Sequence, residues 1–150
     1  MKFEIERKWM PEKAPAVIKG KESREIIQGY LCTDPVIRIR REGDRYYLTY
    51  KGTGAVKRVE YNMDLNEKAF CDLLPKCEGR IIEKTRYFVP LENGLRAEVD
   101  IFHGDLEGRV YVEVEFDSEE EAESFRAPEW FGMEVTGMKG FSNAALSSTS

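Results

Sequence analysis

Pairs of charged residues at alternate positions recur along this chain, and no other sequence feature limits its fold as strongly. In the segment FEIERKW, residues 3–9, Glu4, Glu6 and Lys8 alternate with residues that are apolar except for Arg7. Alternate side chains of an extended strand point to the same side of a sheet, so these three charges share one face. The segment therefore predicts a strand with one charged face and one largely apolar face.

The same alternation returns on later strand-like segments, usually with two charges of one sign. The later pairs are Arg38 with Arg40, Arg58 with Glu60, Lys84 with Arg86, Glu98 with Asp100, and Glu113 with Glu115, and Lys51 ends a further segment. An ordinary antiparallel sheet with one solvated face explains any single pair. A solvated face usually mixes Thr, Ser and Gln with its charges, whereas here like-charged pairs repeat. The repetition favours a face built around one shared ligand.

Eight segments have the alternating or β-branched character of strands. They lie near residues 2–9, 25–33, 36–42, 45–51, 56–63, 80–90, 95–103 and 109–117. Short connections at 42–44, 51–55 and 91–94 suit hairpins, so we expect an antiparallel meander. Eight strands can close into a barrel whose interior holds side chains or one small ligand. If the charges point inward, helices must cover the apolar outer face.

Three short helices are expected between and after these strands. They lie over residues 67–77, over SEEEAESF at 118–125, and around FSNAALSS at 141–148. Asn66 can cap the first helix, which Gly79 would end. Ser118 and Glu121 form a capping-box pair at the start of the second, and Pro128 would stop it. The predicted fold class is mainly β with a few helices (α+β).

Composition limits the functions that this charged face can serve. The 150 residues, 41% of them hydrophobic, suit one domain over 1–150 with a real core. A net charge of −5 argues against a non-specific nucleic-acid or membrane-surface binder. Cys32, Cys71 and Cys77 lack disulfide or zinc spacing, and no signal peptide or apolar run of about 20 residues occurs. We therefore expect a cytoplasmic protein.

The proposed barrel lining balances seven acids against seven bases. The acids are Glu4, Glu6, Glu60, Glu98, Asp100, Glu113 and Glu115, and the bases are Lys8, Arg38, Arg40, Lys51, Arg58, Lys84 and Arg86. The acids concentrate on the first strand and the last two, which become neighbours if the barrel closes. Crowded carboxylates repel one another unless a hard cation such as Mg²⁺ or Mn²⁺ lies among them. Bases opposite them suit an oxygen-rich anion, so polyphosphate with divalent metal satisfies both halves.

These residues resemble a known family, the CYTH superfamily of triphosphate tunnel metalloenzymes. EIERKW fits its ExExK signature. The similarity continues through QGYL at 28–31, RIR at 38–40, LTYKG at 48–52, RVEYN at 58–62, EKTRY at 83–87, EVDIFHG at 98–104, VEVEF at 112–116, and EVT followed by SNAAL near the end. Together, in this order, the motifs are highly specific. The chain looks most like the short bacterial members that resemble inorganic tripolyphosphatase.

The resemblance implies an eight-stranded antiparallel closed barrel, or tunnel, with helices packed outside and a C-terminal helix at one mouth. It implies metal binding by Glu4, Glu6, Glu113 and Glu115, with Asp100 close by. It implies phosphate binding by Lys8, Arg38, Arg40, Lys51, Arg58, Lys84 and Arg86, with Glu60 and Glu98 orienting those bases or the water. Phe141 departs from the family pattern, which usually has a tyrosine there.

We expect a metal-dependent hydrolase that converts a small triphosphate, inorganic tripolyphosphate above all, to pyrophosphate and phosphate. Such chemistry needs an in-line water and stabilisation of charge on the phosphate oxygens. Two Mg²⁺ or Mn²⁺ ions would serve, one bridging phosphate oxygens and one activating the water. The expected catalytic residues are Lys8, Arg58 and Glu60. Tyr30 can reach the bore as a phosphate donor, or it is a structural tyrosine with a satisfied hydroxyl.

Other functions remain open at this point. The alternatives are a class IV adenylyl cyclase, a nucleoside or thiamine triphosphatase, and a polyphosphate-binding module without turnover. His103 lies in a turn without a positioned partner, and KGTG lacks the spacing of a phosphate-binding loop, so neither is expected to be catalytic. The expected partner is a small-molecule triphosphate or polyphosphate, with no nucleic acid and no membrane, bound by a monomer or homodimer.

Overall fold

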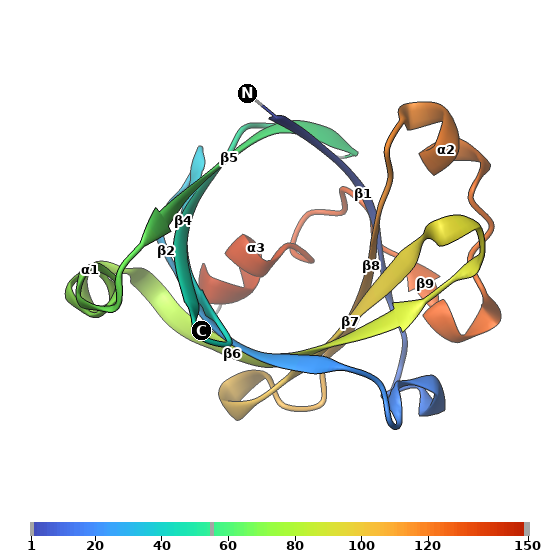
Figure 1. Ribbon diagram of the computed structural model, residues 1–150, viewed down its shortest axis with the longest axis horizontal. Helices are drawn as coiled ribbons and strands as arrows, with labels where there is room; N and C mark the ends of the chain where they lie inside the picture. The colour runs from blue at the N-terminus through green and yellow to red at the C-terminus, as the bar shows by residue number, and fades with distance from the viewer. Residues whose placement is uncertain (1, 55, 149–150) are drawn as a thin grey trace.

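Eight strands pair edge to edge around a closed ring in the computed structural model of the protein, which describes residues 2–54 and 56–148 (Figure 1). The ring strands are β1 (Lys2–Met10), β2 (Ser23–Thr33), β3 (Val36–Glu42), β4 (Arg45–Lys51), β5 (Lys57–Leu65), β6 (Glu78–Pro90), β7 (Arg96–Phe102) and β8 (Val110–Glu115). Each neighbouring pair in the described chain is antiparallel. The predicted closed antiparallel barrel is confirmed.

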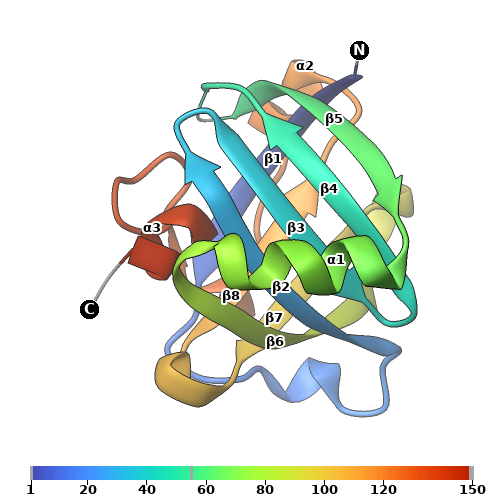
Figure 2. The same cartoon turned by 90° about the vertical axis from the view of Figure 1, so that its left-hand side faces the viewer.

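The order of strands around the ring differs from the single meander expected. The order is β5-β4-β3-β2-β6-β7-β8-β1, and β1 closes the ring by pairing with β5. Two meanders, β2 to β5 and β6 to β8, are therefore joined through β2 and β6. The reason is the connection from β5 to β6, in which α1 (Glu67–Leu73) crosses the outside of the barrel (Figure 2). Phe70 on α1 is buried, with its ring 5.3 Å from that of Tyr46 on β4.

The helices begin where their caps predict, but they end earlier. Asn66 Oδ1 accepts a hydrogen bond from the Ala69 N–H at 2.7 Å. The helix then tightens into the 3₁₀ turn η2 (Leu74–Lys76), and Gly79 lies inside β6, so Gly79 does not end the helix. Helix α2 (Glu119–Ser124) is capped by Ser118 and ends before Pro128. Helix α3 (Asn143–Ser148) is the predicted C-terminal helix.

Several elements are too short to show the periodic pattern of apolar residues by which a sequence reveals a helix or a strand. They are the 3₁₀ turns η1 (Ala16–Ile18), η3 (Glu92–Gly94), η4 (Gly104–Leu106) and η5 (Glu129–Phe131), and the two-residue strand β9 (Met133–Glu134). Strand β9 pairs with the end of β1, opposite Trp9 and Met10. It holds the segment after α2 against the outside of the ring.

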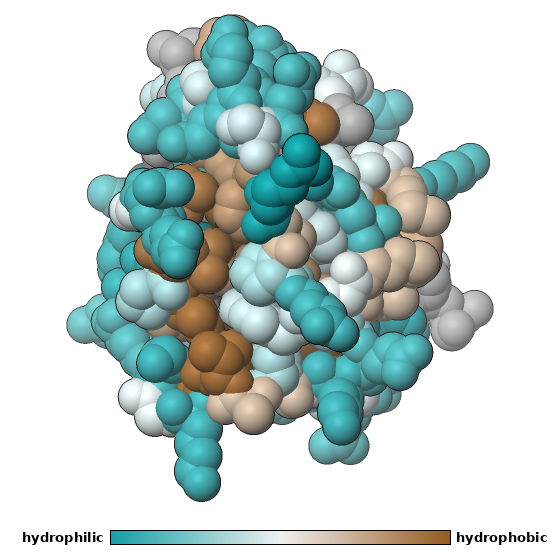
Figure 3. All heavy atoms as spheres, turned by 90° about the vertical axis from the view of Figure 1, so that its right-hand side faces the viewer, coloured by the Kyte–Doolittle hydropathy of each residue, from teal (hydrophilic) through white to brown (hydrophobic). Residues whose placement is uncertain are grey.

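The main apolar core lies outside the ring, between β1, β7, β8 and the segment that contains α2 and η5. Trp9 and Val112 are almost fully buried there. The Trp9 ring lies 4.7 Å from that of Phe131, and 5.7 Å from that of Phe125. The rings of Trp130 and Phe131 lie 4.6 Å apart. Figure 3 shows this face, on which some apolar side chains are exposed between charged ones. The alternation thus places the apolar positions outward, and the charged positions inward.

A second apolar cluster lies where α3 meets one end of the barrel (Figures 1 and 2). Leu146 of α3 is buried against inward side chains that include Tyr30, Phe102 and Tyr111. The bore is therefore apolar and filled at the α3 end, while its middle is charged.

No helix in the part of the chain that the structure describes is both long and apolar enough to cross a bilayer. Cys32, Cys71 and Cys77 are free.

Candidate active site in the barrel

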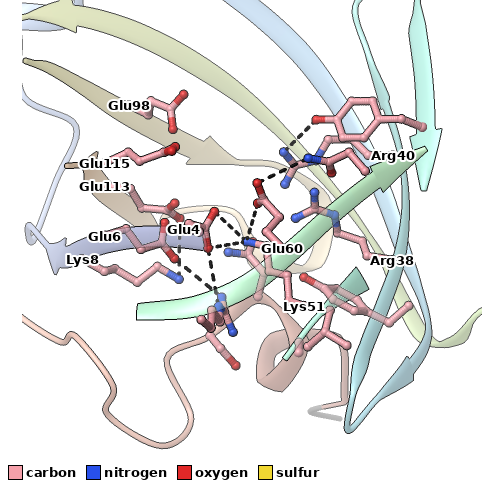
Figure 4. A pocket seen from close by; sticks show the side chains of 18 of the residues that line it. Glu4, Glu6, Lys8, Arg38, Arg40, Lys51, Glu60, Glu98, Glu113 and Glu115 are labelled. Carbon is pink, nitrogen blue, oxygen red and sulfur yellow. Dashed lines mark hydrogen bonds and ion pairs between the residues drawn. The ribbon is translucent and has the colours of Figure 1, made fainter. Parts of the chain in front are cut away.

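A cavity of about 620 Å³ occupies the interior of the ring. The predicted site residues that line it are Glu4, Glu6, Lys8, Tyr30, Arg38, Arg40, Lys51, Arg58, Glu60, Arg86, Glu98, Glu113 and Glu115. Lys84 and Asp100 are the predicted residues that it does not include among its described lining. Figure 4 shows the acids of β1, β7 and β8 on one side, facing Arg38 and Arg40 across the cavity. The two walls are therefore of opposite charge.

The acidic wall forms because β8 lies between β1 and β7. Glu6 stands opposite Glu115, and Glu113 lies between Lys8 on β1 and Glu98 on β7. Burial and the nearby Glu113 carboxylate raise the pKa of Glu6 to about 8. Glu6 therefore holds its proton more strongly than an ordinary glutamate does. A divalent cation at this wall would relieve that repulsion.

Glu4 differs from Glu6 because two bases hold it. Lys51 Nζ donates to both oxygens of Glu4, at 3.0 and 3.1 Å. Arg58 bridges the two glutamates, with Nε 3.5 Å from Glu4 Oε1 and Nη2 3.6 Å from Glu6 Oε1. Burial acts to raise the pKa of Glu4, but Lys51 and a hydrogen bond with Glu60 outweigh it, so the pKa lies below its usual value.

Lys8 connects the acidic wall to the C-terminal segment. Its ammonium lies 3.7 Å from Glu113 Oε1 and donates to the Phe141 carbonyl at 3.2 Å. The ring of Tyr111 packs beneath it at 4.4 Å. Although burial opposes ionisation of Glu113, Lys8 and Arg86 hold the pKa of that carboxyl well below its usual range.

The basic wall contains the buried Arg38 and Arg40, whose hydrogen-bond partners are neutral, although Arg40 Nη1 also lies 3.7 Å from Glu42 Oε1. Arg40 donates twice to Gln28 Oε1, at 2.6 and 2.9 Å, and Tyr47 lies 3.2 Å away. Arg38 donates to Thr49 Oγ1 at 3.1 Å, while its buried Nε finds no hydrogen-bond partner among the described residues. No carboxylate in residues 2–54 and 56–148 forms an ion pair with Arg38. Burial and the neighbouring Arg40 lower the pKa of Arg38.

Asp100 holds two bases from behind the cavity lining. It accepts from Arg86 Nε and Nη2 at 2.8 and 2.9 Å, and from Lys84 Nζ at 2.8 Å. Lys84 and Asp100 are both fully buried, and Lys84 also donates to Asn143 of α3 at 3.1 Å. Burial lowers the pKa of Lys84 to about 7, although Asp100 opposes this. This geometry suits Asp100 to positioning Arg86, and separates it from the lining carboxylates with which the sequence grouped it.

Sequence reasoning missed several residues that line or support the cavity. They are Arg24 and Gln28 on β2, Glu42 on β3, Tyr47 and Thr49 on β4, Asn62 on β5, Phe88 on β6 and Arg96 on β7. Each has the inward parity of the charged residues on its own strand. Extending that parity along each strand would have found them. The pattern of charged pairs does not reveal them, because most of these residues are neutral or lie near strand ends.

His103 has a partner that the sequence did not indicate, Thr85, and the KGTG segment forms the predicted hairpin. His103 Nε2 is 2.7 Å from Thr85 Oγ1, and His103 does not line the cavity in the described structure. The KGTG segment joins β4 to β5 as a hairpin, and its Gly52 and Gly54 line the cavity. Tyr30 is buried with its hydroxyl 3.3 Å from Gln28 Nε2.

The acidic wall fits a divalent cation in the kind of donor that it offers. Glu4, Glu6, Glu113 and Glu115 supply hard carboxylate oxygens from adjacent strands, which Mg²⁺ and Mn²⁺ prefer. Their side chains do not form a ready cage: across the described residues, no three Asp, Glu, His or Cys groups converge as ligands. Glu4 and Glu113 lie in ion pairs instead. A bound cation would replace Lys51 and Lys8 as their partners.

Comparison with known proteins gives a consistent result. The chain matches the CYTH domain family over residues 2–139. It is 42% identical over 147 residues to an inorganic triphosphatase of Nitrosomonas europaea, with 95% of each chain covered. It is 38% identical over 123 residues to an inorganic triphosphatase of Acetivibrio thermocellus, covering 79% of this chain and 77% of that one.

Solved structures share the barrel. The crystal structure of the inorganic triphosphatase NE1496 superposes with a TM-score of 0.72 at 38% identity, covering 100% of this chain and 97% of that chain. A putative adenylyl cyclase from Hippeastrum gives a TM-score of 0.57 at 11% identity, covering 82% and 83% of the two chains. At that identity the likeness shows a common fold alone.

Proposed function

The chain belongs to the CYTH domain family, and from this premise we propose that it hydrolyses inorganic tripolyphosphate to pyrophosphate and orthophosphate inside its barrel. The likeness to inorganic triphosphatases extends along nearly the whole chain, including every strand of the ring. The reaction is an enzymatic hydrolysis of a phosphoanhydride bond, and it depends on metal.

Arg38 carries the proposal. A buried guanidinium without a carboxylate partner is costly unless a ligand brings the negative charge. Arg38 is 6% exposed, lines the cavity, and has only Thr49 as a hydrogen-bond partner among the described residues. Linear tripolyphosphate carries about five negative charges and offers many oxygens to guanidinium donors. Its binding would bring negative charge to the Arg38 guanidinium.

The basic residues fall into two groups, which would contact different parts of the substrate. Arg58 and Lys8 lie beside the acidic wall and would contact the terminal phosphoryl group that is transferred to water. Arg38 and Arg40 on the opposite wall, together with Arg86, would hold the part that leaves as pyrophosphate. Lys84 contacts Asp100 and Asn143, so it would support Arg86 and the α3 mouth more than the phosphates. Lys51 keeps Glu4 in place until metal binds.

Two Mg²⁺ or Mn²⁺ ions held by Glu4, Glu6, Glu113 and Glu115 would neutralise phosphate charge and lower the pKa of a bound water. In the hydrolysis, the water oxygen bonds to the terminal phosphorus as the bridging P–O bond breaks. The electron pair of that bond leaves on pyrophosphate, and one water proton passes to solvent while the other stays on the hydrogen phosphate that forms. Glu60, 3.9 Å from Lys51 and held by Asn62 at 3.3 Å, would orient the water. Glu98 lies 3.5 Å from Arg86 and would orient that base.

The same reasoning extends to the setting of the enzyme. We place it in the cytoplasm as one domain over residues 1–150, a monomer or homodimer that binds small triphosphates and neither nucleic acid nor membrane. The net charge of −5 and the free cysteines support this setting.

The direct test is release of orthophosphate from tripolyphosphate, ATP and thiamine triphosphate, each with Mg²⁺, with Mn²⁺ and with a chelator. We expect strong, metal-dependent release from tripolyphosphate, weak release from the other two, and loss of activity in Glu4→Gln. Faster release from ATP or from thiamine triphosphate would identify that compound, instead of tripolyphosphate, as the preferred substrate. Tight polyphosphate binding without any release would make the protein a binding module.

A further inference from the structure

A second cavity of about 460 Å³ adjoins the first on the side of the acidic wall. The two cavities share Glu6, Lys8 and Arg58 in their linings. The rest of the second lining comes mainly from residues 135–142, the segment between β9 and α3. A group bound at Lys8 and Arg58 therefore faces both cavities.

The segment that covers this side cavity is tied to Lys8 at both of its ends. At one end, the Val135 N–H donates to the Lys8 carbonyl at 2.8 Å, and Thr136 Oγ1 accepts from the Lys8 N–H at 2.9 Å. At the other end, the Phe141 carbonyl accepts from Lys8 Nζ at 3.2 Å. The outer wall of the cavity is thus coupled to a residue that would contact the transferred phosphoryl group.

Residues 137–140, Gly-Met-Lys-Gly, form the loop between these two attachments. Gly137 and Gly140 have φ of +68° and +94°, in the region that glycine adopts without strain. Lys139 is exposed and lines the side cavity, but not the main one. The loop also holds its own hydrogen bonds, from the Met138 N–H to the Val135 carbonyl at 3.0 Å and from the Phe141 N–H to the Met138 carbonyl at 3.3 Å.

The charges of the side cavity suit a small anion. Lys8, Arg58 and Lys139 bring three positive charges to its lining, against one carboxyl group, Glu6. The next step rests on the proposed function. In that reaction the phosphoryl group beside Lys8 and Arg58 becomes orthophosphate when water attacks it, while pyrophosphate remains on the arginine wall. We propose that orthophosphate binds in this side cavity and leaves through it, with Lys139 as the contact at its rim.

The proposal separates the exits of the two products. Orthophosphate has a short way out past residues 137–140, whereas pyrophosphate leaves through the main cavity. A phosphate at Lys8 also competes with the Phe141 carbonyl for the ammonium, which would loosen the attachment of the loop as the product forms.

Product inhibition of tripolyphosphate hydrolysis tests the inference, with orthophosphate and pyrophosphate as separate inhibitors. Lys139→Gln removes the rim charge, and Ala145→Leu narrows the side cavity, because Ala145 lines it and not the main cavity. Lys76→Gln, an exposed lysine on η2 outside both linings, is the matched control. We expect both test variants to raise the inhibition constant of orthophosphate about three- to tenfold. That of pyrophosphate should stay unchanged, as should both constants in the control.

The two failures are distinguishable. Suppose that wild type hydrolyses tripolyphosphate and that both variants have the same inhibition constant for orthophosphate as wild type. This result overturns the side-cavity exit and leaves the proposed function intact. Equal changes for both products overturn the side-cavity exit as well, because they show a common exit. A wild-type protein that does not hydrolyse tripolyphosphate at all overturns the proposed function, and the inference with it.

Discussion

The acidic and basic walls of the barrel are built by the same alternation, yet they solve the burial of charge differently. On the acidic wall, Glu4 and Glu113 find bases, Lys51 and Lys8, within the protein. On the basic wall, Arg38 and Arg40 find mainly neutral groups, such as Thr49 and the side chain of Gln28. Neutral partners fix the direction of a guanidinium without cancelling its charge.

The two walls therefore differ in what must change when their ligands bind. The carboxylates of the acidic wall must exchange their bases for metal, so cation binding there is a replacement. The arginines of the basic wall have little to give up, so anion binding there is an addition that satisfies a buried charge. Substitutions on each wall should therefore have different consequences.

The largest effect is expected from an acidic-wall carboxylate that is exposed. Glu115→Gln should lower metal-dependent hydrolysis of tripolyphosphate by at least about 100-fold, because a metal ligand is lost at the reacting group. The free energy of unfolding should stay within about 0.5 kcal/mol of wild type, as for most surface changes. Steady-state phosphate release and urea unfolding measure the two quantities. Glu119→Gln, exposed on α2 outside the barrel, is the control, and activity retained in Glu115→Gln would refute the ligand assignment.

The next effect concerns stability behind the basic wall. Asp100→Asn should lower the free energy of unfolding by about 3 to 5 kcal/mol, because Lys84 and Arg86 lose their shared buried partner. Asp72→Asn breaks an ion pair of 2.6 Å with Lys68 on the exposed face of α1, and should cost less than about 0.5 kcal/mol. Urea unfolding compares the two. Similar losses in both variants would show that burial of the Asp100 cluster carries no special weight.

A smaller effect follows from the titration of Glu6. The pKa of Glu6 is about 8 in the folded protein against an ordinary value of 4.5, so between these limits the folded state binds more protons than the unfolded one. Stability without metal should therefore fall as pH rises through that window. Lys84, with its pKa lowered to about 7, acts in the opposite direction only above that pH.

Glu6→Gln removes this titration. Between about pH 5 and 7, wild type should lose about 1 to 2 kcal/mol more unfolding free energy than the variant does. Urea unfolding in the presence of a chelator measures the difference at each pH. Parallel pH profiles for the two proteins would contradict the raised pKa of Glu6.

Strand parity explains how much of this site the sequence contains. The period of two places Glu4, Arg38 and Glu113 on one face, because side-chain direction is a local property of an extended chain. How deeply an inward side chain is buried depends on tertiary packing, not on the local sequence. The sequence therefore could not distinguish Asp100 from Glu98 on the same strand. One holds buried bases, and the other lines the cavity.

The order of strands around the ring is the part of the fold that parity does not determine. Pairing between β2 and β6 joins residues about 60 positions apart, such as Glu25 and Thr85, and depends on the path of α1 outside the barrel. Neutral inward residues such as Gln28 and Thr49 were missed because the search followed charge. Caps were found at Asn66 and Ser118 because their hydrogen bonds are local.

The measurement closest to the central contrast is calorimetric binding of tripolyphosphate in the presence of a chelator, where no turnover occurs. Wild type should bind with an affinity at least about tenfold higher than Arg38→Gln, because a charge-assisted contact to an unpaired guanidinium is lost. Lys76→Gln, outside the barrel, should match wild type. Equal affinity in Arg38→Gln and wild type would contradict the account, because the uncompensated charge of Arg38 would then have no part in holding the anion.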